Sequence, residues 1–432
     1  MAAIFAQVTA TQQRRWEVRL PDWKAQSAER PEVPSRSSKR GLDWFAFFVA
    51  DMQTGFGPFL SVYLTTQKWT QVDIGLVLSI GSLASLVGQV PGGWAVDRVQ
   101  SKRRVAAYAV LGIGISALLI ALIPVFATIA AAKLLHVAAS SVLGPAVAAI
   151  TLGLVGHAAV GPRLGRNARF AAAGNGLAAA VMGACGYFVS AQAVFFVTAI
   201  LVVPALLALR MIRERDVDPI RADGGIDATE TNQRATSLGR FFRRPGLIIL
   251  VACVLLFHLA NAAMLPLVGS DVTARTGRWA TVLVAACIIA PQVIVAAISP
   301  AVGQLAQTWG RRPVLLIGFA TLPLRGGLLA LTHDPYMVVA VQALDGISGA
   351  VMGVLVPLAL ADIARGTGRF NLAQGIVGSA TGIGATLSTI GAGYLADRFG
   401  VTSAFWGLAG MGVLALVLLI AIMPETRPAN GD

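Results

Sequence analysis

The chain has 432 residues, of which 56% are hydrophobic and only 13% are charged, and its mean hydropathy is +0.71. Soluble domains carry roughly 25% charged residues, so this chain lacks the polar residues that a water-exposed surface needs. The composition therefore excludes a soluble enzyme and predicts an integral membrane protein. The formal net charge of +13 raises the question of nucleic-acid binding, which depends on where the basic residues lie.

The chain opens with a polar, basic stretch over residues 1–41, which we expect to be a disordered cytoplasmic tail. Beyond it, a bilayer core about 30 Å thick needs ~20 apolar residues in a helix. Helices are expected because an isolated strand would leave its backbone groups unpaired in lipid. This rule predicts twelve membrane-spanning helices, at about 42–65, 73–96, 105–125, 127–154, 171–190, 192–209, 245–268, 279–302, 313–331, 337–362, 371–393 and 403–423.

The basic residues follow a membrane topology. If the N-terminus is cytoplasmic, 28 of the 34 Lys and Arg residues lie in cytoplasmic segments and four lie in loops on the other side. This bias is a strong positive-inside signal and predicts that both termini are cytoplasmic. It also explains the positive charge without nucleic acid, because the basic residues are spread over seven segments.

The longest polar segment inside the chain divides the predicted helices into two groups of six. We therefore expect two bundles joined by a cytoplasmic linker. The predicted regions are a tail (1–41), a first six-helix bundle (42–209), the linker (210–244), a second six-helix bundle (245–424) and a short cytoplasmic tail (425–432).

Several residues of the first half recur in the second half at a nearly constant offset. Gly93 and Gly303 open similar loops at an offset of 210 residues. At an offset of 209 residues, three positions of helix 4 match three of helix 10: Lys133, His136 and Gly144 match Gln342, Asp345 and Gly353. Such repeats indicate a duplicated, pseudo-symmetric six-helix unit.

The loop after the second predicted helix carries a motif. Gly93, Asp97, Arg98, Lys102 and Arg103 follow the pattern G-x-x-x-D-R-x-G-x-R-R, with Gln100 at its second glycine. On these residues the chain resembles the major facilitator superfamily. The equivalent loop of the second half keeps Gly303, Gly310 and Arg312 in register, with Arg311 beside them, and Lys133 lies where many members carry an arginine in helix 4.

The resemblance implies the major facilitator fold, an all-α membrane protein of twelve helices in two pseudo-symmetric bundles. It also implies that helices 1, 4, 7 and 10 line a central cavity. It does not identify a subfamily. Drug antiporters of this superfamily usually carry a Gly-Pro pair in helix 5, and residues 174–186 contain no proline.

Polar and ionisable residues inside membrane spans usually face a cavity or a partner, because a charge in lipid is costly. The candidates for binding substrate or protons are Asp51, Gln53, Lys133, His136, His258, Asn261, Arg325 and Asp345. The alternative for each is an interhelical hydrogen bond with no part in transport. Arg325 and Asp345 are each ten residues from Pro335, in the turn between two antiparallel helices, so they should lie at equal depth and form a pair.

Asp51 has no evident charged partner in the sequence, and the repeat puts His258 within one residue of the equivalent point of helix 7. One acidic and one basic titrating group at similar depth could exchange protons as the cavity opens to each side. The alternative is that Asp51 only forms a hydrogen bond to a neighbouring helix.

The loop motif predicts a gating contact. We expect Asp97 to lie near the N-terminus of a neighbouring helix and near the basic residues that follow it, and so to hold one of two domain arrangements. For the basic residues, the alternative is that they are plain topological anchors. The candidate gating residues are Gly93, Asp97, Arg98, Lys102, Arg103, Gly303, Gly310, Arg311 and Arg312.

These features predict a secondary active transporter of a small solute that works by alternating access in the cell inner membrane, coupled to protons. Export of a metabolite or drug is favoured over uptake. The alternatives are a uniporter without proton coupling, and a non-transporting membrane sensor or lipid scramblase. No phosphate-binding loop, metal-ligand spacing or nucleophile-base pair is evident, so we expect no enzyme, no cofactor, no metal and no nucleic-acid partner, and a monomer in the bilayer.

Overall fold

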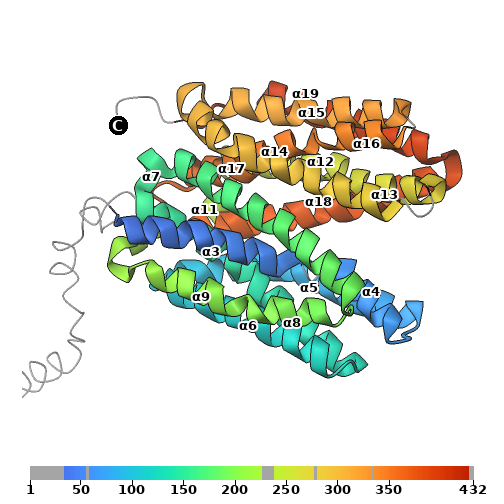
Figure 1. Ribbon diagram of the computed structural model, residues 1–432. Coiled ribbons are helices and arrows are strands. Elements are labelled where there is room, and N and C mark those ends of the chain that lie inside the picture. Colours follow the sequence, from blue (N-terminus) through green and yellow to red (C-terminus); the bar gives the residue numbers. More distant parts are fainter. Residues whose placement is uncertain (1–33, 55–57, 226–237, 277–279, 333, 428–432) are drawn as a thin grey trace, which may run out of the picture.

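The structure is a computed structural model that describes residues 34–54, 58–225, 238–276, 280–332 and 334–427. These residues fold into two helical bundles that lie side by side (Figure 1). The first half contains α3 (Arg36–Thr54), α4 (Pro58–Thr66), α5 (Gln71–Arg98), α6 (Lys102–Leu122), α7 (Phe126–Phe188), α8 (Ala193–Ile200) and α9 (Val202–Met211). The linker contains η1 (Glu214–Asp216), α10 (Pro219–Ala222) and α11 (Leu238–Phe242). The second half contains α12 (Pro245–Asn261), α13 (Met264–Thr276), α14 (Ala280–Thr308), α15 (Arg311–Leu331), α16 (Pro335–Gln342), α17 (Asp345–Ala364), α18 (Phe370–Phe399) and α19 (Val401–Ile422).

The helices agree with the predicted twelve crossings. Within the described residues, nine helices are long and apolar enough to span a membrane. One of them, α7, has 63 residues and reverses direction, so it supplies two crossings. The consecutive helices α3 and α4 supply the first crossing and α18 supplies the eleventh. The chain is thus an all-α membrane protein with two six-helix bundles.

The reversal of α7 occurs at Gly156, whose φ of 68° and ψ of 176° are not helical. A positive φ is accessible to glycine because it has no Cβ. The sequence predicts a polar loop before residue 171, but the chain is helical again directly after Gly156. The basic residues in this stretch therefore lie on a helix, where they can contact neighbouring helices.

Short polar side chains and prolines determine where several helices begin. The side chains of Thr70, Ser101 and Asp334 each accept hydrogen bonds from backbone N–H groups in the first turns of α5, α6 and α16. Pro245 and Pro335 occupy first positions of α12 and α16, where a missing N–H costs nothing.

The linker fixes the start of α3. Helix α3 begins at Arg36, earlier than the predicted residue 42. Ser35 and Ser38 each donate a side-chain hydrogen bond of 2.6 Å to Asp216 of η1. These bonds hold the polar first turn of α3 against the linker, and so the helix can extend beyond its apolar part.

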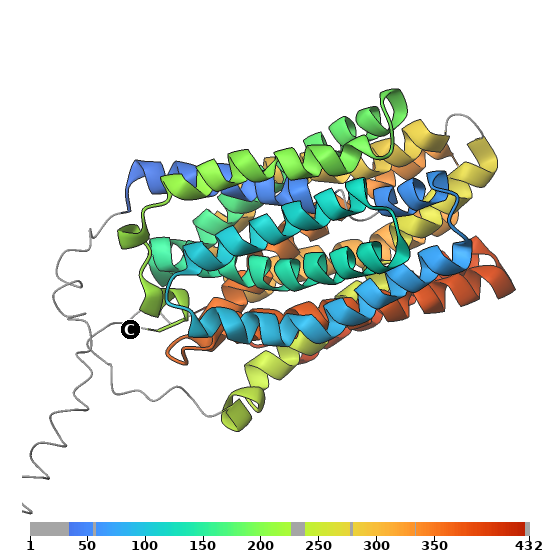
Figure 2. The same cartoon turned by 90° about the horizontal axis from the view of Figure 1, so that it is seen from below.

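The two halves are joined at the end that carries the linker. One buried core cluster combines Leu152, Val160 and Leu164 of α7 with residues of α12, α14, α15 and α17. Towards the other end, the buried clusters belong to one half or the other. Figure 1 shows the same divergence, with α4 and α8 of the first half far from α13 and α16 of the second, and Figure 2 shows the bundle from below.

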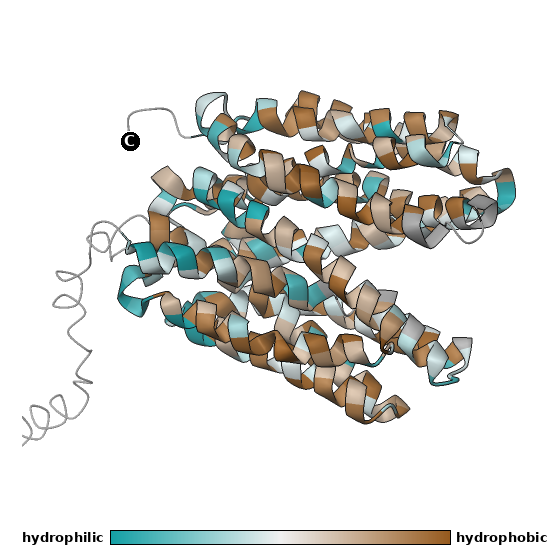
Figure 3. Ribbon diagram, in the orientation of Figure 1, coloured by the Kyte–Doolittle hydropathy of each residue, from teal (hydrophilic) through white to brown (hydrophobic). Residues whose placement is uncertain are grey.

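Hydrophilic residues gather at the linker end and the helices between the two ends are predominantly hydrophobic (Figure 3). Large apolar side chains on the outer surface are exposed, among them Val87, Tyr108, Ile200 and Leu331. In water this surface would be unfavourable, but it matches the hydrocarbon core of a bilayer.

Candidate functional site

A cavity of about 510 Å³ lies between the two halves, lined by α3 and α7 on one side and α14 and α17 on the other. This volume is within the range of small-molecule sites, roughly 300–1,000 Å³. Most of the lining is alanine, valine, leucine and glycine. The polar lining side chains are all uncharged: Gln53, Thr151, Asn167, Asn175 and Gln292. The cavity therefore offers hydrogen bonds and apolar contacts rather than ion pairs.

Of the residues predicted to bind substrate or protons, Gln53 lines this cavity. Asp51 is 6% exposed and is buried in the first half, outside the cavity lining. Lys133 lies across Gly81 of α5, which has no side chain to obstruct it. His136 is also buried, and its Nε2 is 3.4 Å from the hydroxyl of Ser140. The structure thus separates the buried ionisable groups of the first half from the cavity surface.

The predicted pair of Arg325 and Asp345 is present. Arg325, on α15, forms an ion pair with Asp345, at the start of α17, and is 1% exposed. Its guanidinium also donates to the Asn261 side-chain oxygen at 2.6 Å and to the sulfur of Met264 at 3.1 Å. Three predicted site residues therefore form one buried network that ties α12, α15 and α17 together.

His258 lies one turn before the end of α12. Its ring contacts Phe257 edge-on at 5.3 Å, and its Cβ lies against Gly384 of α18. Within the part of the chain that the structure describes, no contact joins His258 to Asp51. Any proton exchange between them would therefore need water or a change of conformation.

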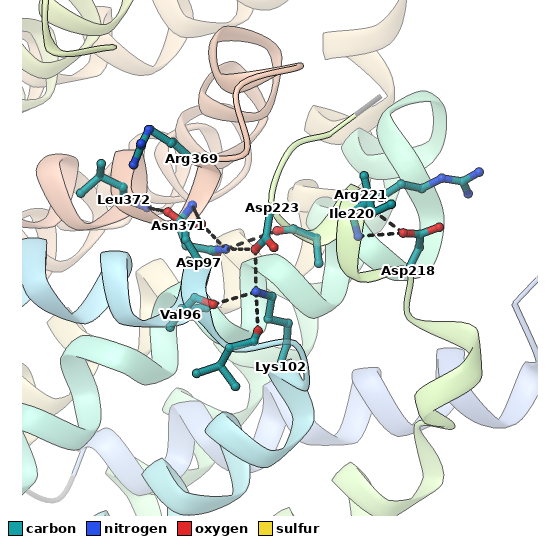
Figure 4. A network of polar contacts seen from close by, with 12 residues as sticks. Val96, Asp97, Lys102, Asp218, Ile220, Arg221, Asp223, Arg369, Asn371 and Leu372 are labelled. Atoms are coloured by element: carbon teal, nitrogen blue, oxygen red, sulfur yellow. Dashed lines mark hydrogen bonds and ion pairs between the residues drawn. The ribbon is translucent and has the colours of Figure 1, made fainter. Parts of the chain in front are cut away.

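Asp97 lies where the loop motif predicts, at the N-terminus of a neighbouring helix (Figure 4). Its carboxylate accepts backbone hydrogen bonds from Asn371 at 3.0 Å and Leu372 at 2.9 Å, in the first turn of α18, and a third from the Asn371 side chain at 2.9 Å. The free N–H groups and positive dipole of a helix N-terminus favour a carboxylate at this place. This contact joins the two halves.

Gly93 allows this contact to form. A Cβ at this position would overlap the carbonyl oxygen of Asn371. The overlapping atom belongs to the backbone, so it cannot move aside by a change of rotamer. The motif glycine therefore permits α5 to approach α18 closely, one turn before Asp97.

The linker takes part in the same network, which the sequence did not reveal (Figure 4). Asp223, directly after α10, accepts from Lys102 at 2.6 Å and from the Asn371 side chain at 3.2 Å. Its backbone carbonyl also accepts from the N–H of Phe370 at 3.2 Å. Burial raises the pKa of Asp223 to about 7, against the opposing charge and hydrogen bond of Lys102.

Of the basic residues expected around Asp97, the structure brings Lys102 near it. Lys102 also donates to the carbonyls of Val96 and Val99, both at 2.7 Å, and so caps the end of α5. Arg98 instead stacks over the ring of Trp94 at 3.6 Å, and Arg103 lies 3.9 Å from Glu214 of the linker.

The second-half loop forms a similar close approach without the carboxylate. Gly303 of α14 packs against the backbone of Gly161 on α7, where a Cβ would overlap the Gly161 carbonyl. Gly310 has a φ of 103°, and Glu425 accepts from the backbone N–H groups of Arg311 at 2.8 Å and Arg312 at 3.0 Å. Arg311 also forms an ion pair of 2.9 Å with Asp362, on α17.

A further buried ion pair was missed by sequence reasoning. Asp43 of α3 is 2% exposed and binds Arg163 at 2.8 Å and Arg166 at 2.7 Å, both on α7. Arg163 also donates to Asn167, which in turn donates to Thr151 at 2.8 Å. The spacing of Arg163, Arg166 and Asn167 is that of one helix face and could have indicated this network, but an apolar criterion assigns these residues to a loop.

Comparisons with known proteins point to the same family over most of the chain. The model of the Major Facilitator Superfamily matches residues 44–298 and 261–432. An uncharacterised MFS-type transporter of Mycobacterium tuberculosis is 40% identical over 400 residues, which are 91% of this chain and 94% of that protein. The multidrug efflux pump LfrA of Mycolicibacterium smegmatis is 28% identical over 189 residues, 43% of this chain and 36% of that protein.

Among solved structures, the proton:xylose symporter XylE bound to 6-bromo-6-deoxy-D-glucose has a similar fold. The TM-score is 0.69, with 90% of this chain and 95% of that chain covered. The sequence identity is 13%, so the likeness concerns the arrangement of the helices alone.

Proposed function

The chain belongs to the Major Facilitator Superfamily, and we propose that it is a secondary active transporter that moves a small solute by alternating access. The observation that carries this proposal is the contact of Asp97 with the N-terminus of α18, which closes the cavity between the halves at the linker end. The separate core clusters towards the other end allow the halves to part there. Making and breaking the Asp97 contact would expose the cavity to each side in turn.

The cavity lining supports an uncharged solute with both apolar and hydrogen-bonding groups. A charged ligand in this cavity would lack an ion-pair partner among the lining residues, and an unpaired charge is costly to bury. Amide side chains such as Gln53 and Gln292 can donate to and accept from a neutral molecule.

We further infer proton coupling, export from the cell, and a location in the inner membrane with both termini cytoplasmic. The buried Asp51 supports coupling, because a carboxyl group inside a membrane span is costly and usually serves a function. The 28% identity to a multidrug efflux pump supports export. The bias of basic residues towards the linker end supports the orientation.

The experiment is a thermal-shift screen of the purified chain against a panel of uncharged amphipathic compounds, with matched cationic and anionic analogues, at pH 6 and pH 8. A ligand of the folded state raises its apparent stability. Flux of the best compound is then measured in proteoliposomes with and without a pH gradient. Accumulation driven by the gradient supports coupled transport, equal flux in both conditions indicates a uniporter, and binding without flux would overturn the proposal.

Gln292→Ala should weaken binding of the uncharged compound because Gln292 lines the cavity. Gln67→Ala is the matched control, since Gln67 is exposed in the turn after α4, outside the cavity. Stabilisation by the charged analogues alone would contradict the assignment of an uncharged solute while leaving the transport proposal standing.

A further inference from the structure

A second, smaller cavity of about 350 Å³ lies at the linker end of the first half, between the first turns of α3 and the second limb of α7. Five of its lining side chains are basic: Arg36, Lys39, Arg40, Arg163 and Arg166. The sixth charged lining residue is Asp43. We call this cavity the basic pocket. It is separate from the central cavity and from the Asp97 contact.

The charges of the basic pocket are far from balanced. Asp43 is already engaged by both Arg163 and Arg166. Within the part of the chain that the structure describes, no carboxylate pairs with Arg36, Lys39 or Arg40. Among the described residues of the pocket, five cations share a single carboxylate, which is a surplus of four positive charges that an anion would neutralise.

An aromatic group adjoins the basic pocket on the same two helices. Trp44 follows Asp43 directly, is 47% exposed, and contacts Phe170 of α7 at 5.9 Å between ring centroids. Phe170 lies one turn beyond Arg166, whose guanidinium is 5.7 Å from its ring. One helical turn deeper than the charges, the surface is thus aromatic and partly exposed. Aromatic side chains of this kind are enriched at the level of lipid headgroups.

We propose that the basic pocket binds a phosphate group, and that this group is the headgroup phosphate of an anionic phospholipid in the leaflet on the linker side. Arginine forks match the oxygens of a phosphate, and basic pockets between membrane helices are suited to anionic headgroups. The free phosphate ion shares the headgroup chemistry, but it would make no use of Trp44 and Phe170. A lipid would place its glycerol and first methylene groups against them.

The test uses the full chain purified in a non-ionic detergent, with binding followed by thermal shift. The probes are dioctanoyl phosphatidylglycerol, dioctanoyl phosphatidylcholine and inorganic phosphate. Each basic residue near an anionic headgroup contributes about 1 kcal/mol, so the variant R36Q/R40Q should bind phosphatidylglycerol roughly 30-fold more weakly than the wild type. The variant R36K/R40K keeps the charges and should retain most of the affinity.

The matched control is R240Q/R243Q, which removes two exposed arginines at the end of the linker, one in α11 and one directly after it, outside the basic pocket. It should bind phosphatidylglycerol as the wild type does. Equal losses in both glutamine variants, or wild-type binding of phosphatidylglycerol no tighter than that of phosphatidylcholine, would overturn the proposal. Full competition by inorganic phosphate at the same concentration would overturn the lipid assignment.

Discussion

Two buried clusters of charged side chains in this protein each lie within one half. Arg325 is neutralised by Asp345 within the second half, and Asp43 is neutralised by two arginines within the first. Such pairs need no contact from the other half, so they can persist while the halves move. Asp97 differs because its partners belong to the opposite half. The change of domain arrangement that we propose for transport would therefore break the Asp97 contact and leave the buried pairs intact.

Arg325→Met should destabilise the protein by about 3–5 kcal/mol, because it leaves the carboxylate of Asp345 without its ion-pair partner. Asp345→Asn should have a similar effect on Arg325. The double variant R325M/D345N buries no unpaired charge and should recover part of the loss. Thermal unfolding in detergent, with a double-mutant cycle, measures the coupling. A double variant no more stable than the weaker single variant would contradict pairing as the source of the effect.

Asp51→Asn should abolish proton-driven accumulation of substrate while leaving downhill exchange partly intact. The reason is that an amide is close to a carboxyl group in size but cannot carry a proton. His258→Gln should move the pH optimum of transport without eliminating flux. Both are measured as flux in proteoliposomes with and without a pH gradient. A well-folded Asp51→Asn protein that still accumulates substrate would show that Asp51 only forms a structural hydrogen bond.

For single residues, the sequence predicts those ion pairs that follow from helix geometry. Arg325 and Asp345 are equidistant from the turn at Pro335, and so their depth was predictable. The contact of Asp43 with Arg163 could not be predicted, because these residues are 120 positions apart and Arg163 falls in a stretch that hydropathy assigns to a loop. Hydropathy records the cost of a charge in lipid but not the partner that offsets it.

At the scale of helices, the two halves meet through two close approaches. Helix α5 packs on α18 through Gly93, and α14 packs on α7 through Gly303. These glycines are related by the internal repeat, so the contacts are pseudo-symmetric. Small residues at both let the helix backbones approach closely, as is common between membrane helices. The carboxylate at Asp97 is found in the first contact, while Gln307 occupies the equivalent position of the second.

Gly93→Ala should prevent α5 from seating on α18, because the added Cβ would overlap the backbone of Asn371. Gly88→Ala, in the same helix, is the matched control. Its Cβ would meet the Ser141 hydroxyl oxygen at an ordinary 3.7 Å, and the substitution should be neutral or stabilising by up to about 1 kcal/mol. Spin labels at Arg104 and Arg243, in a cysteine-free background, report the separation of the halves at the linker end. Equal distances in both variants would exclude a steric role for Gly93.

The helices themselves were largely predictable, since length and apolarity define a membrane crossing. The start of α3 and the reversal of α7 could not be predicted in this way. The first turn of α3 is polar and is stabilised by Asp216 of the linker, and the residues after Gly156 are basic but helical. In both places tertiary contacts extend a helix beyond its apolar segment, which a composition rule cannot detect. The prediction of a disordered tail over residues 1–41 is wrong for residues 36–41, which are helical in α3, and for residues 1–33 it lies outside the described residues.

At the scale of the whole molecule, three segments meet at one point at the linker end. The end of α5 supplies Asp97, the start of α18 supplies Asn371 and the linker supplies Asp223. Asn371 is 0% exposed and donates to both carboxylates. The linker therefore makes direct contacts where the halves meet, in addition to connecting them.

Asp97→Asn should shift the molecule away from this closed arrangement and slow transport far more than it weakens substrate binding. Hydrogen bonds to a charged acceptor contribute about 1.5–3 kcal/mol each, so loss of one such bond would change the ratio of the two arrangements roughly 10- to 100-fold. The label distances at Arg104 and Arg243 measure this ratio, and thermal shift measures ligand affinity. Equal losses of transport and affinity, or none in either, would remove Asp97 from a gating role.

The same contact should depend on pH through Asp223, which lies outside the membrane spans. In the closed arrangement two carboxylates, Asp97 and Asp223, surround the single cation Lys102, and burial raises the pKa of Asp223 to about 7. When the linker end opens, Asp223 becomes solvated and its pKa returns towards the ordinary value near 4. The closed arrangement therefore binds more protons than the open one, and a proton favours closure.

The direction of the pH dependence follows from this difference in proton binding between the closed and open arrangements. The contribution of Asp223 to closure is fully present below about pH 4 and is lost progressively as the pH rises through about 7. Between pH 6 and pH 8 the spin-label distances across the linker end should shift towards the open population. Asp223→Asn cannot ionise at this position, so its pH response should be weaker than that of the wild type, whereas Asp218→Asn, five residues earlier in the linker, should keep the wild-type response. A pH response that is undiminished in Asp223→Asn would assign the titration to another group.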